Sequence, residues 1–193
     1  MIFIVYYMLA YALLTGFFLI ERYVRRGKDT KNMNRTKHDK GSTTLISIAM
    51  GTAFIIIPLS PLFNYLGFGL VFNIWIGTAG ILFGVLGLFI RYLAFTTLGR
   101  FFFRTLREAD AHILVTNGIY QYIRHPGYLS DILIFIGCSL AMGNLLPIVA
   151  VPFLFVIAYS YRIHAEEKML IGIFGEAYRI YQKRSKRLIP FIY

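Results

Sequence analysis

The sequence is poor in the residues that build disulfides and metal sites. It has a single cysteine, Cys138, a single tryptophan and four histidines in 193 residues. One cysteine excludes an internal disulfide framework and a cysteine-rich metal centre. The histidines show neither an HExxH pattern nor a paired i, i+4 spacing, so no metal is expected. A GxSxG elbow, a Walker loop and a GxGxxG turn after a strand are also missing, which argues against the hydrolase, NTPase and soluble dinucleotide-binding classes.

Acidic residues are scarce as well, with 9 Asp and Glu against 20 Lys and Arg and a formal net charge of +11. Such a surplus is typical of nucleic-acid binding, but its placement indicates a membrane protein instead. All the basic residues fall within 22–40, 91–124 and 162–187, and the segments between these blocks have none. Basic loops that alternate with loops lacking Lys and Arg follow the positive-inside pattern and suit an anionic lipid surface. We therefore expect membrane lipid, and no nucleic acid, as a partner.

The apolar content is too high for a soluble domain of this length. Hydrophobic residues make up 58% of the chain, whereas a soluble domain must expose about half of its residues to water. The long apolar segments are residues 1–21, 43–64, 67–93, 128–143 and 145–164. The sequence predicts an all-α integral membrane protein of about five transmembrane helices. With all the basic blocks inside, the N-terminus lies outside and the C-terminus is cytoplasmic.

We expect one membrane domain with two parts. Residues 1–97 form three N-terminal spans with a basic cytoplasmic loop at 22–43, and residues 98–193 hold a helical hairpin at 128–164. An amphipathic, interfacial helix is predicted from about 166 to 186. In the third segment, Gly77, Gly80, Gly84 and Gly87 share one stripe, which favours close helix packing over a groove for a lipid tail.

Polar residues concentrate in two clusters on the predicted cytoplasmic side. In the first, residues 104–131, the run 112–115 is expected to be extended, with backbone groups free to bond a ligand such as an adenine edge. Pro126 biases His125 away from the α region and favours a helix start beside it. Free N–H groups at such a start attract an anion. Taken singly, each residue also fits a capped membrane helix with interfacial aromatic and arginine anchors.

The second cluster covers residues 159–190. Tyr159, Arg162 and Glu166 are spaced i, i+3, i+7 and so lie on one helix face. Arg162 and Glu166 suit either a simple i, i+4 salt bridge or a binding pair. In the second case Arg162 takes a carboxylate and Glu166 a cationic or hydroxylated group. Glu167 has a similar alternative, as a charge that caps the following helix.

The two clusters resemble a known family. The runs HILVTNGIYQYIRHPGY and EEKMLIGIFGEAYRIYQKRSKRLIPFI are similar to the membrane isoprenylcysteine carboxyl methyltransferases, related to phospholipid methyltransferases with the same RHPxY…EE signature. The resemblance covers residues 110–193, and implies a short, prokaryotic-type member whose residues 98–193 form a cofactor-binding methyltransferase core. It implies S-adenosyl-L-methionine as the methyl donor and a prenylated cysteine, or another lipid-bearing carboxylate, as the acceptor at the cytoplasmic face.

The resemblance also assigns roles to individual residues. The donor is expected to contact His112, Ile113, Leu114, Val115, Tyr120, His125, Pro126, Gly127, Tyr128 and Glu166. Arg162 is the expected catalytic residue, which holds the substrate carboxylate, with Tyr159 and Glu167 beside it on the substrate side. A carboxylate is already ionised at pH 7, so its methylation needs alignment but no general base.

Three other functions stay open at this point. A phospholipid N-methyltransferase must deprotonate an amine and therefore needs a base near the site. An isoprenoid or sterol reductase relative would bind a nicotinamide cofactor. A membrane scaffold would use both polar clusters only as interfacial anchors.

Overall fold

The computed structural model describes residues 2–25, 41–98 and 114–189, and within them the chain is helical. The helices, in chain order, are α1 (Ile2–Arg25), α2 (Ser42–Ile56), α3 (Ser60–Tyr65), α4 (Ile74–Leu98), the 3-10 helix η2 (Gly118–Gln121), α5 (Pro126–Met142), α6 (Leu145–Phe174) and α7 (Glu176–Arg184). In these residues, β pairing is limited to the isolated bridges Leu70–Asn144 and Ile123–Lys186. The all-α prediction is confirmed.

The long helices can cross a membrane by length and composition. These are Ile2–Tyr23 within α1, all of α4, and all of α6, whereas α2 and α5 are shorter apolar helices. Each of the five predicted apolar segments thus contains a helix, and the number of spans and their orientation stay predictions. Two boundaries differ from expectation. The second segment breaks between α2 and α3 at Pro58, and the third becomes helical only at Ile74, after Gly67 and Gly69 with φ of 80° and 72°.

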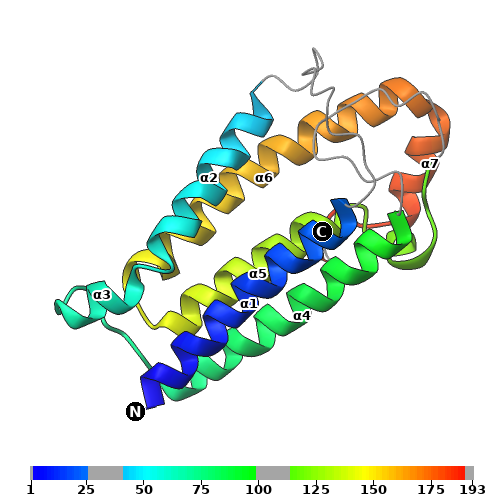
Figure 1. Cartoon of the computed structure of the whole chain (residues 1–193). Coiled ribbons are helices and arrows are strands. Elements are labelled where there is room, and N and C mark those ends of the chain that lie inside the picture. The colour runs from blue at the N-terminus through cyan, green and yellow to red at the C-terminus, as the bar shows by residue number, and fades with distance from the viewer. Residues whose placement is uncertain (1, 26–40, 99–113, 190–193) are drawn as a thin grey trace.

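Figure 1 shows α1, α4 and α5 side by side, with α2 lying along α6 and α3 at the end away from α7. The glycine stripe of α4 lets α1 and α5 pack closely against this helix. A Cβ on Gly80 would lie 2.6 Å from the carbonyl oxygen of Gly137 in α5, and one on Gly84 would lie 2.4 Å from Leu13 of α1. Gly87 faces α5 and Gly77 faces α1 in the same way. The stripe therefore serves helix packing, as predicted, on two neighbouring faces of α4.

The end of α6 differs from the sequence prediction. The helix that begins at Leu145 continues past Glu166 to Phe174, and a short α7 of 9 residues follows. The predicted single helix from about 166 to 186 is therefore wrong. The residues around Glu166 are good helix formers, and the first break comes at Gly175, with φ of 57°.

A buried arginine ties α1, α4 and α5 together. Arg91 of α4 is 3% exposed and donates to the carboxylates of Glu21 in α1 and Asp131 in α5. Its guanidinium also lies over the rings of Phe17 and Phe95, at 4.2 and 4.6 Å from their centroids. Sequence analysis counts Arg91 among the basic residues that set topology, but the structure places it inside the helix bundle.

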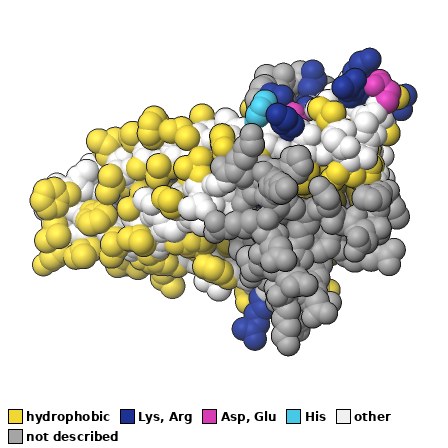
Figure 2. Space-filling model, turned by 90° about the horizontal axis from the view of Figure 1, so that it is seen from above, with side chains coloured by type: hydrophobic (Ala, Val, Ile, Leu, Met, Phe, Trp, Pro, Cys, Tyr) yellow, Lys and Arg dark blue, Asp and Glu magenta, His cyan; other side chains and the backbone are white. Residues whose placement is uncertain are grey.

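Charge and apolar surface are separated along the molecule. Figure 2 shows a face covered by hydrophobic side chains at one end, while most of the visible charged side chains gather toward the end where α7 lies. Hydrophobic side chains such as Trp75, Phe89 and Phe153 are 80%, 58% and 64% exposed. Such exposure is normal for helix faces that contact lipid.

Candidate functional site

The RHPGY stretch lies at the start of α5. His125 is the residue before the helix, with φ of −123° and ψ of 56°, and Pro126 occupies the first turn. A proline has no N–H to lose at that position and already has the helical φ angle. The helix start expected near Pro126 or Gly127 is therefore present. Among the residues that the structure describes, a Cβ on Gly127 would meet nothing within 4 Å, so none of them fills the space beside this turn.

The C-terminal segment runs alongside this stretch. The backbone N–H of Arg124 donates to the carbonyl of Lys186 at 2.7 Å, and that of His125 donates to the carbonyl of Arg187 at 3.0 Å. In return, the N–H of Lys186 donates to the carbonyl of Tyr122 at 2.9 Å. The residues just before α5 are thus fixed by a partner more than 60 positions later in the chain.

His125 lies buried between two carboxylates. The residue is 5% exposed, and its ring stacks on that of Tyr128 with 5.5 Å between centroids and a 12° interplanar angle. Nδ1 is 3.9 Å from Glu166 Oε2, and Nε2 is 3.5 Å from Glu167 Oε1. Within the described part of the chain, Nε2 makes no hydrogen bond of good geometry, and it faces this Glu167 oxygen, with which it forms an ion pair when the ring is protonated. A buried imidazole between two carboxylates is held in one orientation at the start of α5.

Tyr128 joins the two sequence clusters. Its hydroxyl donates to Glu166 Oε2 at 2.5 Å and accepts from Arg162 Nε at 3.1 Å. Arg162 is 3% exposed, whereas the side chain of Glu166 keeps 25% of its surface exposed. The phenol therefore links a buried cation to a partly exposed anion, and α5 to α6.

Arg162 has further partners on α2. Its Nη1 donates to Ser42 Oγ at 2.9 Å and to Thr43 Oγ1 at 3.0 Å. Sequence reasoning did not find these two residues. A serine and a threonine at the start of an apolar helix carry no signal of their own, because such residues are common there as caps.

Glu167 lies between His125 and the C-terminal segment. Its Oε1 accepts from Arg124 Nε at 2.9 Å, and its Oε2 accepts from Arg187 Nε at 3.1 Å. The residue is 4% exposed. These contacts fix the C-terminal segment against the start of α5.

Tyr159 lies deeper in the bundle. It is 2% exposed, its hydroxyl donates to Asp131 Oδ2 at 2.8 Å, and its ring lies 5.1 Å from that of Tyr128. Tyr159 therefore connects the site to the Arg91 cluster.

The remaining predicted donor contacts flank this group. Tyr120 is buried, and its carbonyl accepts from the Tyr181 hydroxyl at 2.6 Å. Burial, helped by the charge of Glu166, raises the pKa of Tyr120 well above its usual value. Leu114 and Val115 are half-buried and non-helical, in keeping with the extended run expected there. His112 and Ile113 lie outside the described residues.

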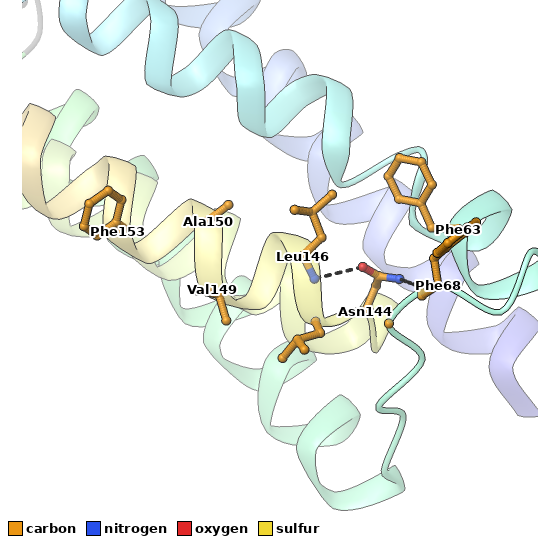
Figure 3. A pocket seen from close by; sticks show the side chains of 9 residues that line it. Phe63, Phe68, Asn144, Leu146, Val149, Ala150 and Phe153 are labelled. Carbon is orange, nitrogen blue, oxygen red and sulfur yellow. Dashed lines mark hydrogen bonds between the residues drawn. The ribbon is translucent and has the colours of Figure 1, made fainter.

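A hollow lies at the other end of α6, around Asn144. Its volume is about 660 Å³, and it is lined by Phe63, Phe68, Gly69, Asn144, Leu145, Leu146, Val149, Ala150 and Phe153. Figure 3 shows Asn144 as the polar side chain among them, with its oxygen accepting from the Leu146 N–H at 3.0 Å. The lining suits hydrocarbon and offers no charged group for a polar ligand.

No group of three or more His, Cys, Asp or Glu side chains with the spacing of a metal site occurs among the residues that the structure describes. Instead, the structure gathers His125, Tyr128, Arg162 and Glu166 at the junction of α5 and α6. This arrangement provides a fixed buried cation beside a partly exposed carboxylate, which suits simultaneous binding of an anionic and a cationic group.

The family model, the curated relatives and the solved structure that match this chain are all isoprenylcysteine methyltransferases. The model of the isoprenylcysteine carboxyl methyltransferase family matches residues 80–172. A protein-S-isoprenylcysteine O-methyltransferase of Dictyostelium discoideum is 35% identical over 121 residues, which are 62% of this chain and 50% of that protein. Protein-S-isoprenylcysteine O-methyltransferase B of Arabidopsis thaliana is 30% identical over 164 residues, covering 80% of this chain and 82% of that protein.

A solved structure is similar as well. The eukaryotic intramembrane Ras methyltransferase, an isoprenylcysteine carboxyl methyltransferase, matches with a TM-score of 0.62 at 27% identity. The match covers 96% of this chain and 65% of that one. This chain therefore corresponds to about two thirds of the solved chain, and to half of the Dictyostelium protein.

Proposed function

Because this chain belongs to the isoprenylcysteine carboxyl methyltransferase family, we propose that it transfers a methyl group from S-adenosyl-L-methionine to the carboxylate of a lipid-modified cysteine. The observation that supports this most directly is Arg162, a buried arginine held by Tyr128, Ser42 and Thr43 beside the start of α5. A desolvated arginine with a fixed orientation is well suited to bind a carboxylate.

The donor contacts are proposed along the RHPGY stretch. S-adenosyl-L-methionine supplies a methyl group activated by a sulfonium and also has an α-carboxylate and an adenine. The Glu166 carboxylate attracts the cationic part of such a ligand, and the ring of His125, whose Nδ1 faces Glu166 at 3.9 Å, lies beside it. The space next to Gly127 allows close approach to the backbone of the first turn of α5. Tyr120, Pro126, Tyr128 and the backbone of Leu114 and Val115 complete this proposed lining.

The acceptor needs alignment but no activation. Its carboxylate is ionised at pH 7, so an oxygen attacks the methyl carbon directly. One C–O bond forms as the carbon–sulfur bond breaks, the sulfonium becomes a neutral thioether, and no proton moves. Arg162 orients the carboxylate, and its burial excludes the water that would otherwise compete for it. A buried arginine also favours an anionic acceptor over the cationic amine of an aminophospholipid.

The site is proposed to face the cytoplasm. The segment that carries Lys183, Arg184, Lys186 and Arg187 lies against the start of α5, where the proposed donor site begins. Basic residues beside membrane spans are retained on the cytoplasmic side. The lipid tail of the acceptor would then reach Arg162 sideways from the bilayer.

The role of Arg162 is tested by replacing it. We expect Arg162→Ala to lower kcat/KM for a prenylcysteine acceptor by about 100-fold or more, since a charged hydrogen bond is worth about 1.5–3 kcal/mol and a fork makes two. Donor binding, measured by calorimetry in detergent, is expected to stay within about twofold. Arg179→Ala is the matched control, because Arg179 is 61% exposed in α7 and pairs only with exposed Glu176 among the contacts described. Wild-type turnover by Arg162→Ala would refute the assignment.

A further inference from the structure

The start of α2 contacts the proposed acceptor arginine from the part of the chain that lies outside the family match. Ser42 and Thr43 precede residue 80, where the match to the family model begins. Ser42 is 0% exposed, and Gly41 before it has a φ of 85°, which allows the chain to turn directly into the helix. α2 then packs along α6, the helix that carries Arg162.

The two hydroxyls hold one end of the guanidinium while Tyr128 holds the other. Nη1 donates to Ser42 Oγ at 2.9 Å and to Thr43 Oγ1 at 3.0 Å, and Nε donates to the Tyr128 hydroxyl at 3.1 Å. Hydrogen bonds at both ends fix the position and the plane of a side chain that otherwise has many rotamers. Loss of the two hydroxyls would remove this restraint from the Nη1 end of the guanidinium.

The chemistry of these partners matters as much as their geometry. Ser42, Thr43 and Tyr128 are neutral, so these three hydrogen bonds orient the guanidinium without adding a negative charge of their own. Glu167 provides a contrast within the same protein, because its carboxylate is paired with Arg124 and Arg187 at 2.9 and 3.1 Å.

We propose that Ser42 and Thr43 are positioning residues for the acceptor carboxylate, acting through Arg162. This inference rests on the proposed function and extends it: the N-terminal half of the chain supplies part of the acceptor site, and the site is complete only when α2 is seated against α6. The donor site is not affected, since His125 and Glu166 have no contact with α2 among those described.

The test compares Ser42→Ala/Thr43→Val with the matched control Thr44→Val. Thr44 is exposed one residue further along α2, so its change has the same chemistry without the contact. We expect the double variant to raise KM for a prenylcysteine acceptor about tenfold, because two hydrogen bonds to a charged group are lost. Donor affinity, measured by calorimetry, should change by less than about twofold. Thr43→Ser, which keeps a hydroxyl at position 43, should avoid most of the rise in KM. A rise in acceptor KM without a change in donor affinity is expected because the substitutions act only through Arg162.

A double-mutant cycle separates positioning from a general structural effect. In an Arg162→Ala background, the Ser42→Ala/Thr43→Val change should cause no further loss, because the side chain that it positions is gone. An acceptor KM within twofold of wild type, an equal fall in donor affinity, or fully additive losses would each overturn the inference while leaving the proposed function intact. Absence of methyl transfer by the wild-type protein would overturn both.

Discussion

Replacing Arg91 with methionine should destabilise the helix bundle more than any change to its partners. Arg91 is the cation between Glu21 and Asp131, and their side chains are 3%, 7% and 11% exposed. Methionine fills a similar volume but leaves both carboxylates without their arginine. Removal of one partner from a buried ion pair costs about 3–5 kcal/mol. Asp131 still accepts from the Tyr159 hydroxyl at 2.8 Å, so we expect the lower end of that range and not twice its value.

The charges that remain after each substitution distinguish Arg91→Met from Asp131→Asn. Asp131→Asn keeps the shape of the side chain and leaves one arginine facing one carboxylate. We expect it to cost about 1–2 kcal/mol, the scale of one weakened hydrogen bond to a charged group. Although Arg91 and Asp131 are in contact, Arg91→Met is therefore expected to lower the free energy of unfolding more than Asp131→Asn does.

Cys138 provides the assay. This cysteine is buried with 0% exposure, so a thiol-reactive fluorophore reports its release on heating in detergent. A loss of about 3 kcal/mol corresponds to a fall in Tm of about 6–12 °C for a protein of this size. Glu21→Gln/Arg91→Met/Asp131→Asn, which removes all three charges, should recover most of that fall. Arg91→Met melting within 2 °C of wild type, or Asp131→Asn costing as much, would refute the reasoning about buried charge.

Three further changes have matched controls. Gly80→Ala should cost about 1–3 kcal/mol in the same melting assay, because its Cβ would lie 2.6 Å from the Gly137 carbonyl. Gly51→Ala, whose Cβ would meet no described residue within 4 Å, should be neutral or stabilising. A fall in Tm of the same size for both variants would contradict close α4–α5 packing. Glu167→Gln should speed trypsin cleavage after Arg187 several-fold, because it weakens the pairs that fix the C-terminal segment; Glu176→Gln, in an exposed pair, should not. His125→Ala should weaken S-adenosyl-L-methionine binding about tenfold by calorimetry, the scale of one charged hydrogen bond, while exposed His164→Ala leaves it unchanged.

Much of the site could be predicted because its residues carry local signals. A proline after His125 fixes where α5 begins, and the i, i+3, i+7 spacing places Tyr159, Arg162 and Glu166 on one face of α6. Placing the two clusters at one membrane side required only the pattern of basic residues. The contact from Tyr128 to Arg162 and Glu166 then follows from the meeting of α5 and α6.

The parts that could not be predicted depend on contacts between distant residues. Ser42 reaches Arg162 across 120 positions of sequence, and nothing near Ser42 indicates that partner. From the sequence, Arg91 counts only as one of the basic residues that set topology, because its two carboxylate partners lie on other helices. The bridge between Ile123 and Lys186 joins two segments without strand character. In each case tertiary packing, and not local propensity, decides the outcome.

Labelled methyl transfer decides whether the acceptor is the carboxylate of a lipid-modified cysteine. Purified protein in lipid would receive S-adenosyl-L-methionine with a labelled methyl group and, separately, a prenylcysteine, the corresponding prenylcysteine carboxamide, an aminophospholipid or a fatty acid. The account predicts label on the prenylcysteine as an ester that base releases as methanol, with none on the carboxamide. Base-stable label on the aminophospholipid, or no transfer to the prenylcysteine, would contradict it.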